Sequence, residues 1–474
     1  MSDSTSSPAA VAAPLRDLLA ESAGVVRAVL AGRSMTDAIG QVPAPLRAGT
    51  QALSFHTMRR LGEARAARRI LVPRTPPEPL AEALLLVSLA LLLPGPTGAA
   101  AIEHAPQAPF YVPPGITQAI APETAGTPAA GAPAYAPYTV VDQAVEAAGR
   151  LPRVAPLKGL VNGALRSFLR DRDTLLPQLS RQIEARWNHP QWWVDKLRSA
   201  YPDAWESILA AANVPAPMTL RVNCRRATRE QVLAAFLAAG VDGQPAGAAG
   251  IVLAQPRPVQ RLPGFEDGWW SVQDAGAQLA APLLGVKDGM RVLDACAAPG
   301  GKTAHLLELA DIDLLALDAD AGRLRRVGDN LRRLGLDTPR VSLRAGDAAN
   351  PDDWWDGQPF DAVLADVPCT ASGIVRRHPD IRWLRRPDDV PRTVKLQTRI
   401  VDALWRTVAP GGRLLYVTCS VFPEEGERQA AAFAARHADA RRLEAPGQLL
   451  PVAAGATETA QHDGFFYALF AKAT

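Results

Sequence analysis

Residues 271–474 alternate between short apolar segments and amphipathic ones, and this alternation limits the folds open to the chain more than any other feature. The apolar segments are MRVLDA, DLLALD, RVSLRAGD, DAVLAD and RLLYVTCS, and helical spacing marks KTAHLLELA and RLRRVGDNLRRLG between them. Strands that alternate with helices build a doubly wound, largely parallel α/β sheet. Ligands of such sheets bind beyond the carboxyl ends of the strands. We therefore expect the functional residues at these ends.

The part of the chain ahead of this sheet is predicted to form two more domains, as its 474-residue length allows. Apolar residues at helical spacing predict an all-α domain over 14–178, interrupted by a Pro/Ala/Gly-rich insert at 94–137 that we expect to be a disordered loop. Residues 179–270 mix helix and strand signals, which indicates a small α+β module. The low-complexity residues 1–13 are expected to be disordered.

Cysteine usage and hydropathy favour a cytoplasmic protein without a metal site. Cys224, Cys296, Cys369 and Cys419 are too few for a disulfide framework and form no C-x-x-C pair. The N-terminus lacks the features of a secretory signal. The apolar run 83–93 is about half the length needed to cross a bilayer, so we interpret it as a buried core helix and expect no membrane association.

Net charge does not identify a partner, because Lys and Arg exceed Asp and Glu only by 51 to 48. Basic residues do cluster in the predicted all-α domain, where they can follow phosphates or form a solvated helix face. The clusters comprise Arg59, Arg60, Arg65, Arg68 and Arg69, and then Arg150, Arg153, Lys158, Arg166, Arg170 and Arg172.

The segment VLDACAAPGGKTAHLLE, residues 292–308, runs from a strand through Pro299, Gly300 and Gly301 into a helix. Two glycines let the backbone approach a ligand at a helix N-terminus, which indicates a nucleotide-like ligand. The segment differs from the G-x-G-x-x-G of dinucleotide oxidoreductases. It also lacks a P-loop, because Cys296 occupies the position of the first P-loop glycine.

Three aspartates follow successive predicted strands, namely Asp318, Asp347 and Asp366. A carboxylate at the first position suits a ribose diol, the second is placed for an adenine edge, and the third faces the reactive end of the ligand. A single strand-terminal aspartate usually caps the next helix. Three in succession favour a ligand site.

Two cysteines follow the last two strands of the alternating pattern, Cys369 in DVPC and Cys419 in TCS. The fold is expected to bring them to adjacent loops over the cofactor. A free cysteine is usually a small buried hydrophobe, and we interpret Cys224 and Cys296 in that way. A core role explains Cys369 and Cys419 less well, because both lie in loops.

The motifs CAAPGGK, D-x-P-C and T-C-S, in this order, resemble those of the Nol/Nop/Sun family of RNA cytosine-C5 methyltransferases. The resemblance covers residues 181–474 and includes HPQWW, LRVN, VQDAGAQ, RRHPDIRW and DGFFYA. It implies a Rossmann-like class I methyltransferase domain at 271–474 that binds S-adenosylmethionine. The cofactor residues it implies are Cys296, Ala297, Ala298, Pro299, Gly300, Gly301, Lys302, Asp318, Asp347 and Asp366.

The same resemblance implies that Cys419 is the nucleophile and that Cys369 promotes release. Carbon 5 of cytosine is a poor nucleophile, and a thiolate that adds to carbon 6 activates it. Lys302 is a candidate to stabilise the thiolate. Asp366 is expected to hydrogen-bond the edge of the base and to help protonate the ring.

The helical front part, chiefly residues 140–172, resembles the RNA-binding domain of the antitermination factor NusB. Its fusion to the catalytic half is similar to the bacterial RsmB/Sun/Fmu type, which implies 16S rRNA or a small-subunit precursor as substrate and RNA binding by both front domains. We expect a monomer. Val367 and Gly426 depart from the usual family residues, and the 94–137 insert is unusual.

RNA contacts are expected beside the Cys369 loop, where basic residues gather near Trp383; the alternative is a solvated loop. The candidates are Arg376, Arg377, His378, Arg382 and Lys302. Other functions remain open from the sequence. They are methylation of tRNA or another rRNA, and a non-catalytic RNA-binding assembly factor. A nicotinamide-dependent oxidoreductase is disfavoured by PGGK.

Overall fold

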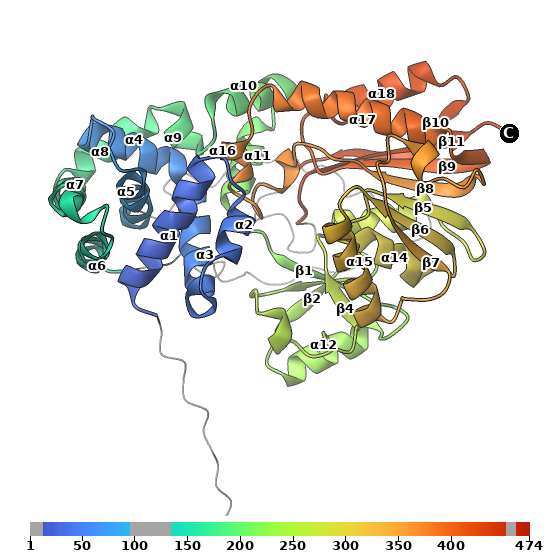
Figure 1. Ribbon diagram of the computed structural model, residues 1–474, viewed down its shortest axis with the longest axis horizontal. Coiled ribbons are helices and arrows are strands. Elements are labelled where there is room, and N and C mark those ends of the chain that lie inside the picture. The colour runs from blue at the N-terminus through green and yellow to red at the C-terminus, as the bar shows by residue number, and fades with distance from the viewer. Residues whose placement is uncertain (1–12, 95–132, 134, 452–460) are drawn as a thin grey trace, which may run out of the picture. The chain divides into compact units, whose positions relative to one another are not determined.

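The computed structural model describes residues 13–94, 133, 135–451 and 461–474 (Figure 1). The expected disordered segments 1–13 and 94–137 lie almost wholly outside these residues. The described chain forms two compact units. Unit 1 contains residues up to 194 together with 378–384, and unit 2 contains 195–377 and 385–474. Unit 1 therefore extends past the expected boundary at 178 and takes in a short segment from the C-terminal half.

Unit 1 is helical, as the apolar spacing predicts. Its helices are α1 (Leu15–Leu30), α2 (Met35–Gly40), α3 (Ala44–Arg59), α4 (Leu61–Leu71), α5 (Pro79–Leu92), α6 (Pro137–Arg150), α7 (Lys158–Arg170), α8 (Arg172–Ser180), α9 (Ile183–Trp187) and α16 (Ile381–Leu384). Helix α10 (Gln191–Ala200) crosses from unit 1 into unit 2, where α11 (Trp205–Asn213) follows.

Helix α5 is the most apolar helix of unit 1 and contains most of the run 83–93. Its residues from Ala83 to Ala90 are all buried. A helix that is apolar on every side belongs in a core, so the expectation of a buried core helix is confirmed. In the described part of the chain, no helix has both the length and the apolar character to span a membrane.

Residues 378–384 complete the core of unit 1 although they follow the Cys369 loop in sequence. Asp380 accepts a hydrogen bond from the backbone N–H of Met35 at 2.9 Å, at the start of α2. The indole of Trp383 donates to the carbonyl of Met58 at 2.8 Å, and the Arg65 guanidinium lies over its ring at 5.3 Å. Trp383 thus packs with the helices of unit 1.

Unit 2 is built on a seven-stranded sheet in the order β10-β11-β9-β8-β5-β6-β7. Its strands are β5 (Arg291–Ala295), β6 (Asp313–Asp318), β7 (Val341–Ala345), β8 (Phe360–Asp366), β9 (Val408–Thr418), β10 (Ala440–Leu449) and β11 (Phe465–Lys472). The strands from β5 to β9 pair in parallel, and β11 is antiparallel to both its neighbours. The predicted doubly wound sheet is confirmed.

Each face of this sheet has its own hydrophobic core, because successive strand residues point to opposite faces. Val292, for example, belongs to one core and Leu293 to the other. The first core includes side chains of α13 (Ala280–Leu284), α14 (Gly301–Leu309) and α15 (Ala321–Leu334). The second includes those of α17 (Asp389–Trp405) and α18 (Glu427–Arg436), so helices cover both faces (Figure 1).

A smaller antiparallel sheet, in the order β2-β3-β1-β4, forms the α+β module within unit 2. It contains β1 (Met218–Val222), α12 (Arg229–Ala238), β2 (Gly243–Ala246), β3 (Gly250–Leu253) and β4 (Trp270–Val272). Helix α12 starts with a capping box, in which Thr228 and Gln231 exchange side-chain-to-backbone hydrogen bonds.

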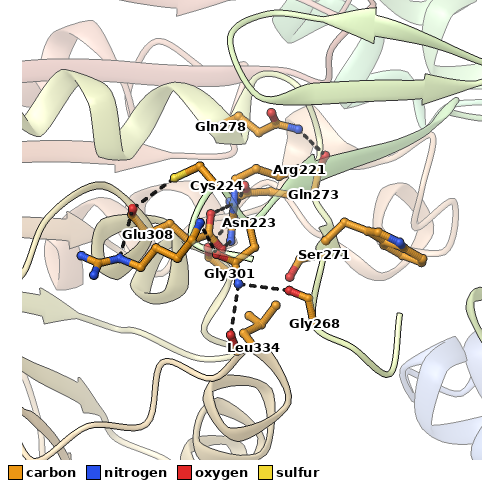
Figure 2. Close-up of polar contacts among 12 residues, drawn as sticks. Arg221, Asn223, Cys224, Gly268, Ser271, Gln273, Gln278, Gly301, Glu308 and Leu334 are labelled. Atoms are coloured by element: carbon orange, nitrogen blue, oxygen red, sulfur yellow. Dashed lines mark hydrogen bonds and ion pairs between the residues drawn. The ribbon is translucent and has the colours of Figure 1, made fainter. Parts of the chain in front are cut away.

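Arg221 of strand β1 links this module to helix α14 (Figure 2). It is completely buried and forms a bidentate ion pair with Glu308, with two N–O distances of 2.7 Å. It also donates to the carbonyl of Gly301 at 2.7 Å and to the side chain of Gln273. A planar guanidinium matches this set of acceptors, whereas a lysine ammonium does not. Arg221 therefore fixes the first residue of α14.

We predict that Arg221→Met destabilises the protein by about 3–5 kcal/mol, because it leaves the Glu308 carboxylate buried without its partner. The double variant Arg221→Met/Glu308→Leu should recover most of this loss, since it removes both buried charges. Urea unfolding followed by tryptophan fluorescence measures both effects. Equal losses in the single and the double variant would contradict the role of the ion pair.

Candidate functional site

The parallel strands bring the predicted site residues to one edge of the large sheet. Cys296 follows β5, and Asp318, Asp347 and Asp366 end or follow β6, β7 and β8. Cys419 follows β9, which is parallel to β8. All five residues therefore lie at carboxyl ends of neighbouring strands, where α/β sheets bind ligands.

The loop between β5 and α14 makes a tight turn. Cys296 has a φ of +62° and Gly300 a φ of +95°, a region that favours glycine. A Cβ on Gly300 would lie 3.0 Å from Cγ1 of Val327, so the turn packs closely on α15. Helix α14 begins at Gly301 without a side-chain cap. Its first amides therefore suit an anionic or polar ligand group.

Asp318 supports this loop, because its carboxylate accepts from the backbone N–H groups of Ala298 and Asp320, both at 3.0 Å. It does not cap helix α15; Asp320 does so through the N–H groups of Gly322 and Arg323. A carboxylate can accept about four hydrogen bonds, so Asp318 keeps sites for a hydroxyl-bearing ligand.

Asp347 is exposed and accepts from the backbone N–H of Ala349 at 2.9 Å. Together with Asp318, it gives carboxylates at the ends of two neighbouring strands beside the glycine turn. This donor and acceptor set fits a nucleoside with a ribose diol and a polar base edge.

Lys302 and Asp366 form an ion pair, with Nζ 2.6 Å from Oδ2. Burial acts to lower the pKa of Lys302, but the attraction of Asp366, with Cys419 also contributing, raises it overall. Lys302 therefore stays cationic beside Cys419, which follows β9. Cys296 has the opposite environment, because burial raises the pKa of its thiol and the carboxylates of Asp366 and Asp318 raise it further. Cys296 stays a neutral thiol.

Cys369 and Cys419 lie next to each other, with their Sγ atoms 3.4 Å apart and hydrogen-bonded. The hydrogen bond to Cys419 is the main cause that raises the pKa of Cys369 well above that of an ordinary thiol, and burial adds to it. The raised pKa favours the protonated thiol at Cys369, and either sulfur atom can be the donor in this hydrogen bond. Both side chains are half-buried, and neither is locked in a disulfide.

The Arg376 and Arg377 side chains are engaged inside the protein. Both pair with Asp463, and Arg377 also binds Asp274, with Nη2 2.7 Å from Oδ2. Although burial opposes charge on Arg377, the attraction of Asp463 and Asp274 raises its pKa overall. The expected phosphate contacts of these two arginines are wrong for this structure, because their partners are carboxylates distant in sequence.

The expected RNA contact of Arg382 does not fit this structure either. Arg382 is fully buried in unit 1, where Nη1 donates to the carbonyl of Asn188 at 3.3 Å. Burial, with the charge of Arg59, lowers its pKa to about 9. A buried guanidinium cannot reach a phosphate. His378 is half-buried, and its contact with RNA stays a prediction.

The two arginine clusters of unit 1 differ from each other. In the first, Arg68 pairs with Glu82 at 2.8 Å and Arg60 with Glu63 at 2.9 Å. These two arginines bind carboxylates of the protein, so they fit neither phosphate binding nor a solvated helix face. In the second, most side chains are exposed, namely Arg150, Arg153, Lys158, Arg166 and Arg170. In the first cluster Arg69 is exposed, so the second cluster presents the larger accessible basic surface. Cys224 is exposed as well, so its interpretation as a core residue is wrong.

Fold and loop are those of a Rossmann-like protein that binds a nucleoside-containing ligand, and the comparisons place it among the S-adenosylmethionine-dependent methyltransferases. Residues 281–471 match the family described as 16S rRNA methyltransferase RsmB/F, and residues 189–260 match its ferredoxin-like domain. Ribosomal RNA small subunit methyltransferase B of Escherichia coli O6:H1 is 44% identical over 339 residues, which are 71% of this chain and 78% of that protein. The chain belongs to the RsmB/F methyltransferase family, and its cofactor is S-adenosylmethionine.

Solved structures show the same fold. The crystal structure of PH0851 covers 96% of this chain and 99% of its own, with a TM-score of 0.69 and 24% identity. A methyltransferase homolog from Pyrococcus horikoshii covers 61% of this chain and 97% of its own, with a TM-score of 0.51 and 28% identity. Among the described residues, no group of His, Cys, Asp and Glu side chains is arranged to hold a metal ion.

Asp294, at the end of β5, is a site-adjacent residue that the sequence did not single out. It is fully buried, and Thr303 Oγ1 donates to its Oδ2 at 2.6 Å. Its Oδ1 has no hydrogen-bond partner among the described residues. Burial raises the pKa of Asp294 to about 7. The folded protein therefore favours the protonated acid.

Because the pKa of Asp294 is raised on folding, its stabilising contribution is full below about pH 4 and is lost as the pH rises to about 7. Asp294→Asn should remove this dependence. We predict that the unfolding free energy of the wild type falls relative to that of the variant by roughly 1.4 kcal/mol per pH unit across this window. Urea denaturation between pH 4 and 8 tests this, with the exposed substitution Asp352→Asn as control. Parallel pH profiles would contradict it.

Proposed function

We propose that this protein transfers a methyl group from S-adenosylmethionine to carbon 5 of a cytosine in 16S rRNA, through a covalent bond between Cys419 and carbon 6. The observation that carries the proposal is the cysteine pair. Its Sγ atoms lie 3.4 Å apart on loops that follow neighbouring parallel strands. The Lys302–Asp366 ion pair lies on the same sheet edge.

The cofactor is proposed to bind along the strand ends beside this pair. The loop from Cys296 to Lys302, including Ala297, Ala298, Pro299, Gly300 and Gly301, would contact it through the backbone. Asp318 would bind the ribose hydroxyls and Asp347 the adenine edge. Asp366 would lie at the reactive end. When bound, S-adenosylmethionine supplies an electrophilic methyl group.

Cys419 would act first, because carbon 5 of cytosine needs activation before it can take a methyl group. The Sγ–C6 bond forms, and Asp366 is placed to hydrogen-bond the base while the ring gains a proton. With the cofactor bound, carbon 5 would then take its methyl group as the sulfur–methyl bond breaks, which leaves S-adenosylhomocysteine. Carbon 5 would lose its own proton, and the ring the proton it had gained, to water. The Sγ–C6 bond breaks, which returns the thiolate and leaves 5-methylcytosine. Lys302 stabilises the thiolate before and after this cycle.

Cys369 would assist release, since its sulfur already exchanges a hydrogen bond with the nucleophile. The names of the relatives support 16S rRNA or a small-subunit precursor as the substrate. The target base has to be unpaired or flipped, because carbon 6 is inaccessible within a duplex. We expect the enzyme to act in the cytoplasm as a monomer.

Cys419→Ala should abolish methyl transfer and leave S-adenosylmethionine binding close to normal, because only the nucleophile is lost. Cys369→Ala should accumulate a protein–RNA adduct that survives denaturing electrophoresis. Radiolabelled methyl transfer, calorimetry and gels measure these effects. Methyl transfer by the Cys419 variant would refute the nucleophile. Normal turnover without an adduct in the Cys369 variant would refute the release role.

The substrate is tested by comparing unmodified 16S rRNA, small-subunit precursors and tRNA side by side. We expect methylation of the 16S substrate at one cytosine, which bisulfite sequencing of rRNA from a deletion strain identifies as a lost modification. Preferred methylation of tRNA would instead support the alternative substrate. Tight RNA binding without methyl transfer to any substrate would support a non-catalytic assembly factor.

A further inference from the structure

A completely buried carboxylate, that of Glu425, joins the two cysteine loops. Its Oε1 accepts from the backbone N–H of Thr370, next to Cys369, at 2.8 Å. Its Oε2 accepts from the hydroxyl of Ser420, next to Cys419, at 2.6 Å, and also from the hydroxyl of Thr370. One side chain therefore holds the residues that follow both cysteines.

Helix α17 supplies the other donors to this carboxylate. Thr393 Oγ1 donates to Oε1 at 2.7 Å, and Gln397 Nε2 donates to it at 3.2 Å. Gln397 also donates to the carbonyl of Pro368, just before Cys369, at 2.9 Å. All these contacts to Glu425 come from donors. An ionised carboxylate accepts hydrogen bonds only, so the surroundings fit a negative charge at this position.

That charge lies close enough to affect the cysteine pair. After the hydrogen bond to Cys419 and burial, the charges of Cys419 and Glu425 also raise the pKa of Cys369. The geometry acts in the same direction, because Glu425 bonds to two groups of Thr370, beside Cys369, and to one group of Ser420, beside Cys419.

We propose that Glu425 is a positioning residue that fixes the separation of Cys369 and Cys419 and keeps the proton of the pair on Cys369. The proposal rests on the proposed function, in which Cys419 has to be the thiolate. It adds the reason why one of two adjacent thiols is the nucleophile. No bond to substrate is assigned to Glu425.

Selective alkylation of the full-length protein, without RNA or S-adenosylmethionine, tests this directly, because only thiolates react quickly with iodoacetamide. In the wild type we expect Cys419 to react at least roughly ten times faster than Cys369 at pH 7.5, as peptide mass spectrometry would measure. In Glu425→Gln we expect the two rates to come within about threefold, and Cys369 to react at lower pH than in the wild type.

A matched control lies on the same helix as Thr393. Thr398 Oγ1 contacts the carbonyl of Val394 and the side chain of Gln429, and has no contact with Glu425. Thr398→Val should keep the wild-type selectivity. Thr393→Val, which removes one donor to Glu425, should reduce it. This comparison separates the loss of a half-buried hydroxyl from the loss of a hydrogen bond to Glu425.

If Glu425→Gln does not fold, Thr370→Val and Ser420→Ala decide the question, because each removes one loop contact and keeps the charge. Each should lower the selectivity about threefold or more. Unchanged selectivity in folded Glu425→Gln, or in both loop variants, overturns the proposal. Failure of the proposed function shows elsewhere, as methyl transfer by Cys419→Ala, whatever the alkylation result.

Discussion

Parallel pairing of β5 through β9 is the constraint on which the site depends. Parallel strands end at the same edge, so each loop that follows a strand adds its residues to a common surface. Cys369 and Cys419 are 50 residues apart in the chain and 3.4 Å apart in the structure for this reason. Strand β11 pairs antiparallel with β9, on the side of β9 that faces away from β8. It extends the sheet and leaves β8 and β9 as direct neighbours.

Buried charges hold this edge in place. Arg221 fixes the start of α14, Arg377 joins the carboxylates of Asp274 and Asp463, and Glu425 joins the two cysteine loops. Removing charges from water is costly, and well-packed apolar residues often stabilise as much. Ion pairs do, however, have directional geometry. They suit a site in which sulfur atoms and carboxylates have to keep fixed separations.

Much of this architecture follows from periodicity in the sequence. The alternation of strand and helix segments predicts the sheet, and the strand ends indicate the cysteines and aspartates, because these depend on local pattern alone. The partners of Arg376, Arg377 and Arg382 could not be predicted in this way. Arginine in a loop usually faces solvent, whereas here its acceptors come from segments far away in the sequence.

Asp274 and Asp463 lie within quoted motifs and Glu425 precedes Gly426, but none of the three had an assigned role, since a carboxylate reveals its function only through the donors around it. The same applies to Asp294, whose raised pKa comes from burial and not from its neighbours in sequence. The resemblance of the front domain to NusB stays a prediction. Its accessible basic surface, on and near α7, agrees with RNA binding but does not identify the RNA.

The membership of residues 378–384 in unit 1 has a consequence for biosynthesis. A ribosome makes the chain from its N-terminus, and domains usually fold as soon as they emerge. Unit 1 cannot do so completely, because Asp380 and Trp383 are hydrogen-bonded to the residues Met35 and Met58. The core of unit 1 can therefore be completed only after residues 378–384, well inside the catalytic half, have been translated.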